Sequence, residues 1–195
     1  MKFKTAIAII TTLIILLASM SQAGVMLGEN PGNTDEASVK WYTAEEAYAL
    51  NQKEPRKFFF DLYTHWCGWC KKMDATTFGN LIVAEYLNKT YYPVKFNAEI
   101  TDTVYFRDKA YPYVSAGRRG YNQLAFDLAD GRLSYPTIVF LDEQANTIQA
   151  VPGYRDAEEL DRILKYFGEN HYRTTDWATF STNYNSPFAS PTPGQ

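Results

Sequence analysis

The sequence predicts an α/β protein in which helices flank a central mixed sheet. Three observations support this class: helical and strand-like segments alternate in the first half of the chain, a pair of adjacent strands follows, and an amphipathic helix closes the pattern. The chain has 195 residues, of which 46% are hydrophobic, and this suits one domain with one core. The formal net charge is −3. This composition implies no basic face and argues against nucleic acid as the main partner.

The first helix and the first strand follow from a capping pattern and an apolar run. Thr43 and Glu46 have the spacing of a capping box, which predicts a helix over residues 43–52. Pro55 ends that segment. Residues 57–63 form a nearly continuous aromatic and aliphatic run, which favours a strand buried on both faces.

The remaining elements are predicted from the spacing of apolar residues and from turn signals. They are a helix over 80–89, a strand over 92–97, an inserted hairpin within 101–120, a short helix over 121–130, strands over 137–141 and 147–151, and a helix over 156–167. Residues 173–195 are rich in Ser, Asn, Pro and Gly, so we expect a C-terminal tail that is largely irregular.

The first 23 residues have the pattern of a cleaved secretory signal peptide. Lys2 and Lys4 precede an apolar run, and Ser21-Gln22-Ala23 offers small residues at a signal-peptidase site. The run of about twelve residues is short for a membrane span of ~20, although an uncleaved anchor is the alternative. We therefore expect cleavage near Ala23, a flexible leader over residues 24–38, and export, most simply to a bacterial periplasm.

The chemistry of the sequence is concentrated in its two cysteines, Cys67 and Cys70, which form a C-x-x-C pair. Such a pair serves redox exchange, zinc binding or a structural disulfide. Structural zinc needs four ligands, and His65 and His171 have no ligand spacing, so no metal is expected. A structural disulfide that closes so short a loop would contribute only about 2 kcal/mol.

Redox exchange is the favoured use of this pair. Residues 64–73 lack strand alternation and are predicted to be a turn that runs into a helix. Cys67 opens this helix, and the free N–H groups and dipole at a helix N-terminus stabilise a thiolate. Cys70 follows one turn later, which is close enough to resolve a mixed disulfide.

The segment around the cysteines resembles the active site of the thioredoxin family. The run Phe60-Asp61-Leu62-Tyr63-Thr64-His65-Trp66-Cys67-Gly68-Trp69-Cys70-Lys71 has the family's buried strand, its acid, its Trp before the first Cys and its Lys after the pair. Tyr135-Pro136-Thr137 resembles the loop that carries the family's cis-proline, and Pro152-Gly153-Tyr154 resembles the glycine turn before the last helix. The resemblance covers residues 39–172 and is strongest to exported bacterial thioredoxin-like proteins with an insertion before the cis-proline strand.

The resemblance implies a thioredoxin-like fold and a role for each residue of the site. Cys67 is the expected nucleophile and Cys70 the resolving thiol. Asp61 matches the buried acid that moves protons to and from the resolving thiol, and we expect it to be an unpaired charge whose burial is costly. Pro136 is expected to be cis, with its loop backbone pairing with an extended substrate. The expected substrate-binding surface also includes Trp66, Gly68, Trp69 and Tyr135.

The sequence departs from the family pattern in three places. Trp69 replaces the proline that is usual between the cysteines, and Tyr135 stands where thioredoxins usually have a smaller residue. The insertion at 101–120 has no counterpart in the minimal fold, and it could cover or extend the substrate groove. Its Arg118 and Arg119 could recognise an acidic partner, although a salt-bridged loop is the simpler interpretation.

Three functions remain open at this point. The favoured one is an exported monomeric enzyme that reduces disulfide-containing protein substrates. It would draw electrons from a membrane thiol carrier and would need no cofactor besides the Cys67–Cys70 pair. The second is a disulfide oxidase or isomerase of the same fold, but strong oxidases often place a His between their cysteines and Gly68-Trp69 lacks one. The third is a non-catalytic binding module, against which the intact cysteines argue.

Overall fold

The structure of the protein is a computed structural model that describes residues 38–188. The predicted signal peptide over 1–23 and all but the last residue of the predicted leader over 24–38 lie outside the described residues. Among residues 38–188, no helix has both the length and the apolar character needed to cross a membrane.

A four-stranded mixed sheet forms the centre of the fold, as the sequence predicts. Its strands are β1 (Lys57–Tyr63), β2 (Tyr91–Asn97), β7 (Thr137–Leu141) and β8 (Thr147–Pro152), in the order β2-β1-β7-β8. Strand β1 pairs parallel with β2 and antiparallel with β7, which in turn pairs antiparallel with β8. The inner strands are β1 and β7, and these are the two runs that the sequence marks as most continuously apolar.

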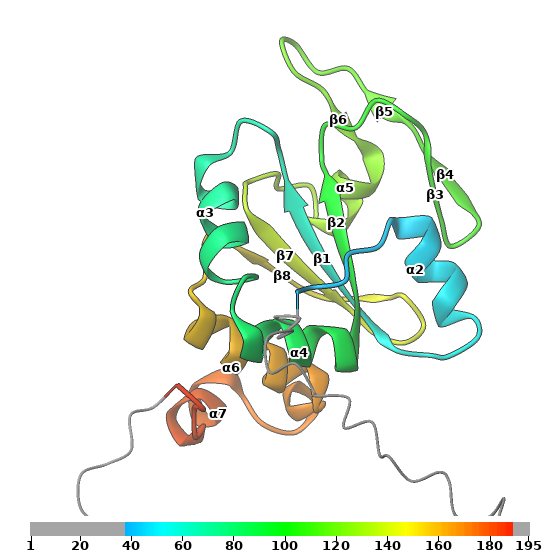
Figure 1. Ribbon diagram of the computed structural model, residues 1–195. Coiled ribbons are helices and arrows are strands. Elements are labelled where there is room, and N and C mark those ends of the chain that lie inside the picture. The colour runs from blue at the N-terminus through cyan, green and yellow to red at the C-terminus, as the bar shows by residue number, and fades with distance from the viewer. Residues whose placement is uncertain (1–37, 189–195) are drawn as a thin grey trace, which may run out of the picture. The chain divides into compact units, whose positions relative to one another are not determined.

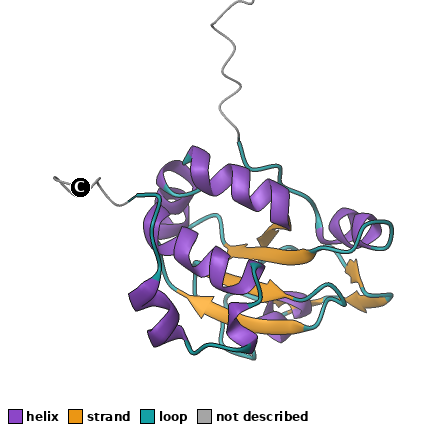
Figure 2. Cartoon of the chain, turned by 90° about the horizontal axis from the view of Figure 1, so that it is seen from below, coloured by secondary structure: helices purple, strands orange, loops and turns teal. Residues whose placement is uncertain are grey.

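Helices cover both faces of this sheet (Figures 1 and 2). One face packs against α3 (Gly68–Thr76), α4 (Leu81–Thr90) and α6 (Ala157–Gly168), and the other against α2 (Ala44–Asn51) and α5 (Gln123–Leu128). A hydrophobic cluster lies on each face of the sheet, and successive side chains of β1 point into alternate clusters. Phe59 packs on the face covered by α3, α4 and α6, whereas Phe58 and Phe60 pack on the face covered by α2 and α5.

The helix starts follow from side-chain caps. Thr43 and Glu46 form the predicted capping box, in which the Thr43 hydroxyl accepts the Glu46 N–H and the Glu46 carboxylate accepts the Thr43 N–H. Asn80 caps α4, and Asp156 forms a second capping box at α6. These caps satisfy N–H groups that would otherwise lack partners at the first turn of each helix.

The insertion differs from the predicted single hairpin, because it contributes to two short strand pairs. The first pair is β3 (Val104–Phe106) with β4 (Lys109–Tyr111). The second is β5 (Tyr113–Val114) with β6 (Tyr121–Asn122), and β6 lies just after the insertion, at the start of the segment predicted to be a helix over 121–130. Arg107 and Asp108 both have positive φ, at 51° and 57°, which closes a tight two-residue turn. Lys109 and Ala110 follow this turn directly and pair with Phe106 and Tyr105.

The C-terminal tail, which is expected to be largely irregular, includes one short helix that the sequence did not predict. This helix is α7 (Trp177–Asn183), which Asp176 caps by accepting the Thr179 N–H. The aromatic rings of Trp177 and Phe180 pack at 5.2 and 5.1 Å from that of Tyr166 on α6. Aromatic packing against α6 therefore orders residues whose polar neighbours suggested a tail without structure.

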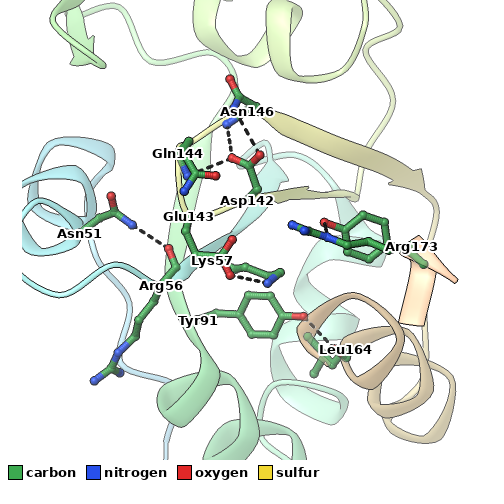
Figure 3. A network of polar contacts seen from close by, with 11 residues as sticks. Asn51, Arg56, Lys57, Tyr91, Asp142, Glu143, Gln144, Asn146, Leu164 and Arg173 are labelled. Atoms are coloured by element: carbon green, nitrogen blue, oxygen red, sulfur yellow. Dashed lines mark hydrogen bonds and ion pairs between the residues drawn. The ribbon is translucent and has the colours of Figure 1, made fainter. Parts of the chain in front are cut away.

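The start of β1, opposite the end at which β1 leads into α3, is held by a network of polar contacts (Figure 3). Lys57 is only 4% exposed at its side chain, and its Nζ lies 2.5 Å from Oε1 of Glu143. Burial alone would raise the pKa of Glu143, but the hydrogen bond and charge of Lys57, a backbone hydrogen bond and the charge of Arg173 together outweigh it, so the pKa is lowered. Nearby, the Tyr91 hydroxyl donates to the Leu164 carbonyl at 2.7 Å and joins β2 to α6.

Removing Glu143 should destabilise the fold because it leaves the Lys57 charge buried without its partner. Breaking a buried pair costs ~3–5 kcal/mol. Since the side chain of Glu143 is 29% exposed, we expect Glu143→Ala to fall at or below the lower end of that range in urea unfolding. Adding Lys57→Met to this variant should restore part of the loss. A double variant no more stable than Glu143→Ala would contradict this explanation.

Candidate active site at Cys67 and Cys70

The two cysteines lie where β1 leads into α3 (Figure 1). Cys67 is the N-cap of α3, and its Sγ accepts a hydrogen bond from the Cys70 N–H at 3.0 Å. The two residues form a disulfide, with Cα atoms 5.3 Å apart. Cys67 and Cys70 are 5% and 2% exposed. The sulfur of Cys67 therefore sits at the positive end of the helix dipole, which is the position predicted for it.

The Tyr135-Pro136 loop lies at the same end of the sheet. The register pairs Thr137 of β7 with Leu62 of β1, so Pro136 is level with the last residue of β1. The Tyr135–Pro136 peptide bond is cis, as expected. The Pro136 carbonyl accepts the Gly153 N–H at 2.8 Å. The fold thus brings together the three segments that carry the resemblance.

Two exposed indole rings flank the disulfide. Trp66 and Trp69 are 53% and 57% exposed, although both are large apolar side chains. The Trp66 ring meets Tyr135 edge-on at 5.9 Å, and the Trp69 ring lies 5.4 Å from Tyr154. Each indole therefore contacts a tyrosine ring and still keeps about half of its surface exposed, which makes it available to a bound polypeptide. A Cβ added at Gly68 would meet nothing within 4 Å, so the space above this residue is open as well.

Asp61 lies beneath α3 and is 1% exposed. The expectation of an unpaired charge is wrong, because Lys95 on β2 places its Nζ 2.5 Å from Oδ2 of Asp61. The same ammonium group also forms an ion pair with Asp74 of α3. The other carboxylate oxygen of Asp61, Oδ1, is buried without a hydrogen-bond partner. One lysine thus links the buried acid to the helix that carries Cys70.

Burial and the neighbouring lysine act on Asp61 in opposite directions. Desolvation raises the pKa of Asp61, and attraction and hydrogen bonding to Lys95 offset only part of that rise, so the pKa is about 6. For Lys95, burial disfavours the charge, but attraction and hydrogen bonding to Asp61 and Asp74 together outweigh it, so the pKa is raised. A carboxyl group with a pKa near neutrality can both take up and release a proton under physiological conditions.

Sequence reasoning missed Lys95. The register pairs it directly with Asp61, and its ammonium lies 4.9 to 5.3 Å from the ring centroids of Trp41, Tyr63 and Phe78. The available signal was its position as the one charged residue in the strand Tyr91–Asn97. A lysine inside a buried strand needs a partner, and the acid in the neighbouring strand supplies one.

The sequence also did not reveal the contacts that three charged residues make with the two exposed indoles. The Trp66 indole N–H donates to the Glu99 carboxylate at 3.0 and 3.1 Å, and the Arg119 guanidinium lies 4.4 Å from the Trp66 ring centroid. On the other side, the Lys72 ammonium lies 4.9 Å from the Trp69 ring centroid.

No group of three or more His, Cys, Asp or Glu residues within 38–188 is arranged to hold a metal ion. A hollow of about 850 Å³ runs along β8, α6 and α7, but none of the predicted site residues lines it. The features that can carry chemistry therefore gather at the disulfide.

A cysteine pair at a helix N-terminus, beside a cis-proline and above a buried acid, defines a thiol–disulfide oxidoreductase of thioredoxin-like fold. Comparison with protein families agrees, since the family described as thioredoxin-like domain matches residues 44–168. The chain belongs to this family.

Solved structures with a similar fold include "DsbH Oxidoreductase", with a TM-score of 0.50 and 14% identity over 68% of this chain and 86% of that one. A thioredoxin-fold protein from Helicobacter pylori has a TM-score of 0.49 and 16% identity over 71% of this chain and 91% of that one. A putative disulphide-isomerase from Bacteroides thetaiotaomicron has a TM-score of 0.48 and 22% identity over 67% of this chain and 93% of that one. No curated protein sequence matches the chain.

Replacing Asp61 with Asn should stabilise the oxidised protein at pH 7. A carboxyl pKa raised from 3.8 to about 6 corresponds to about 3 kcal/mol at 1.36 kcal/mol per unit. The stability that this group contributes is fully present below pH ~3.8 and is lost as the pH rises through ~6. In urea unfolding, Asp61→Asn should therefore be more stable than wild type at pH 7, by up to about 3 kcal/mol, and this gain should disappear near pH 4.

The matched control is Asp74→Asn, which removes the more exposed carboxylate from the same lysine. This variant should give no comparable gain at pH 7. A loss of stability in Asp61→Asn that is the same at both pH values would mark Asp61 as a structural ion-pair partner only.

Proposed function

We propose that the protein is an exported enzyme that reduces disulfide bonds in protein substrates. The observation that carries this proposal is the Cys67–Cys70 disulfide at the N-terminus of α3, flanked by two exposed indole rings. A pair kept for stability alone would not need its surroundings to be open to a large partner. We infer that the electrons pass only through these two sulfurs, with no further cofactor.

The reaction begins with the reduced pair. The Cys67 thiolate attacks one sulfur of the substrate disulfide, a mixed disulfide forms, and the second substrate sulfur leaves as a thiolate that takes up a proton. Cys70 then loses its proton and attacks Cys67 Sγ. The Cys67–Cys70 disulfide forms, and the first substrate sulfur leaves as a thiolate that is protonated in turn. The substrate gains two electrons and two protons. Both electrons come from the cysteine pair, one proton comes from Cys70, and the other comes from solvent, to which Cys67 released its proton when it became a thiolate.

Asp61 would take the proton from Cys70 in the second step. Its pKa of about 6 leaves it mostly ionised at neutral pH and still able to accept a proton. Its ion pair with Lys95, which is shared with Asp74 of α3, holds it beneath the helix that carries Cys70. Lys95 acts as a positioning residue in this mechanism, because it touches the acid and not the sulfur atoms.

Export and the electron source belong to the same proposal. Lys2, Lys4 and the apolar run that follows them have the composition of a secretory signal. In an oxidising compartment, a reductase needs a supply of electrons, and a membrane thiol carrier would provide it.

If the signal is cleaved as proposed, N-terminal sequencing of the protein from its native host should begin near Gly24. Soluble protein that retains Met1 would contradict export.

The two cysteines should behave differently when each is replaced. Because Cys67 is the attacking thiol, Cys70→Ser should accumulate mixed disulfides with substrate proteins, and Cys67→Ser should accumulate few. Non-reducing gels of the two variants after incubation with oxidised proteins would measure this. The opposite pattern would reverse the assignment of nucleophile and resolving thiol.

The direction of electron flow can be tested through the reduction potential. Gly68 and Trp69 bring no charge to Cys67, and a helix dipole worth ~0.3–1 kcal/mol shifts a two-electron couple by only about 6–20 mV. We therefore expect a potential nearer to that of thioredoxin, about −270 mV, than to that of a strong oxidase, about −120 mV. Equilibration in glutathione or dithiothreitol buffers, read by tryptophan fluorescence, measures it. A value above about −180 mV would reject the reductase direction.

A further inference from the structure

Residues 115–120 of the insertion form an arm that the fold anchors beside the disulfide. The arm joins β5 to β6, whose residues Tyr113 and Asn122 pair across its base. Gly117 in the arm has a φ of +62°, which favours glycine. Gly120 is packed so closely that an added Cβ would lie 2.3 Å from the Tyr113 ring and from the Val114 carbonyl. The course of the arm therefore depends on these two glycines.

The base of the arm is tied to the end of β1. The Asn122 N–H donates to the Ala98 carbonyl at 2.7 Å, and the Ala98 N–H donates to the Tyr63 carbonyl at 2.9 Å. Asn122 is buried, and its side-chain amide also donates to the Tyr111 and Asp102 carbonyls. Two backbone hydrogen bonds thus connect the arm to the last residue of β1, from which the chain continues to Cys67. Figure 1 shows the arm and the β1–α3 connection at the same end of the sheet.

The arm places an arginine over the exposed indole next to Cys67. The Arg119 guanidinium carbon lies 4.4 Å from the Trp66 ring centroid. The ring itself is held by its hydrogen bond to Glu99 and by its edge contact with Tyr135. A guanidinium stacked on an indole keeps the N–H groups along its edge free to bind a planar acceptor.

Arg119 has no carboxylate partner among residues 38–188, and neither does Arg118 beside it. The interpretation of a salt-bridged loop is therefore wrong for the described part of the chain. Both arginines are exposed, although the chain carries 22 acidic residues that could have paired with them. The acidic group closest to the Trp66 ring, Glu99, is engaged by the indole N–H.

We propose that Arg119, stacked on Trp66, forms a subsite that binds a carboxylate side chain close to the reactive cystine of a polypeptide substrate. A carboxylate matches the guanidinium edge in charge and in its planar, two-oxygen shape. The second exposed indole also has a cation over its ring, since the Lys72 ammonium lies over Trp69 as the Arg119 guanidinium lies over Trp66. The inference rests on the proposed function, since it names the substrates that the Cys67–Cys70 pair would reduce.

The test compares two synthetic peptides that contain an intramolecular disulfide. In one peptide Glu flanks both cysteines, and in the other Gln does. The reduced protein is mixed with each oxidised peptide, and the second-order rate constant is divided by that measured with dithiothreitol, which corrects for the peptide's own reactivity. The corrected Glu/Gln ratio should be about two to five for wild type, the range that an ion pair of ~0.4–1 kcal/mol provides.

The ratio should fall to about one in Arg119→Gln and should be intermediate in Arg119→Lys, which keeps the charge but loses the planar edge. The matched control is Lys53→Gln, which removes an exposed cation from the loop that precedes β1, at the opposite end of the sheet. This control should keep the wild-type ratio. A wild-type ratio of one, or an Arg119→Gln ratio equal to that of wild type, would overturn the subsite while leaving the reductase proposal intact. If wild type reduces neither peptide, the proposed function fails and the subsite fails with it.

Discussion

The site depends on the pairing of β1 with strands on both of its sides. Because β1 is an inner strand with six of its seven residues buried, its carboxyl end is held in place by β2 and β7. The chain leaves this end through a short turn and enters α3 at Cys67. The loop before β7 supplies Pro136, and the segment after β2 supplies Glu99 and the anchor for the insertion arm. Four segments therefore meet at one end of the sheet: the start of α3, the loop before β7, the segment after β2 and the insertion arm.

The same strand also carries the main energetic cost of the site. Asp61 is buried among apolar groups, and its raised pKa records a folded state that disfavours its charge even with Lys95 beside it. A core residue of similar shape without a charge would be easier to bury. The charged Asp61 lowers the stability of the folded protein at neutral pH, but it places beneath α3 a group that can exchange protons. Catalytic acids and bases commonly have pKa values shifted by burial in this way. Asp74 adds to the rise in the pKa of Asp61 through like-charge repulsion, and it gives Lys95 a partner whichever form Asp61 takes.

Much of the fold could be predicted from local patterns. The bounds predicted for β1 and β7 match the structure because continuous apolar runs mark buried strands, and Thr43 marks the start of α2 because a capping box is a local contact. The cis-proline loop and the cysteine pair were recognised from contiguous motifs. The contact of Lys95 with Asp61 and that of Arg119 with Trp66 were not predicted, since they depend on strand register and on the course of the insertion. Helix α7 was missed because its order comes from aromatic contacts with α6.

Every role proposed for the site requires that Cys67 and Cys70 catalyse thiol–disulfide exchange on protein substrates. The reduction of insulin by dithiothreitol, followed by the turbidity of the released chains, measures this exchange. Catalytic amounts of the wild-type protein should shorten the time before turbidity appears, and Cys67→Ser should have no such effect. If turbidity appears no sooner with wild type than with dithiothreitol alone, the two cysteines do not catalyse exchange, and a binding module built on the same fold is favoured.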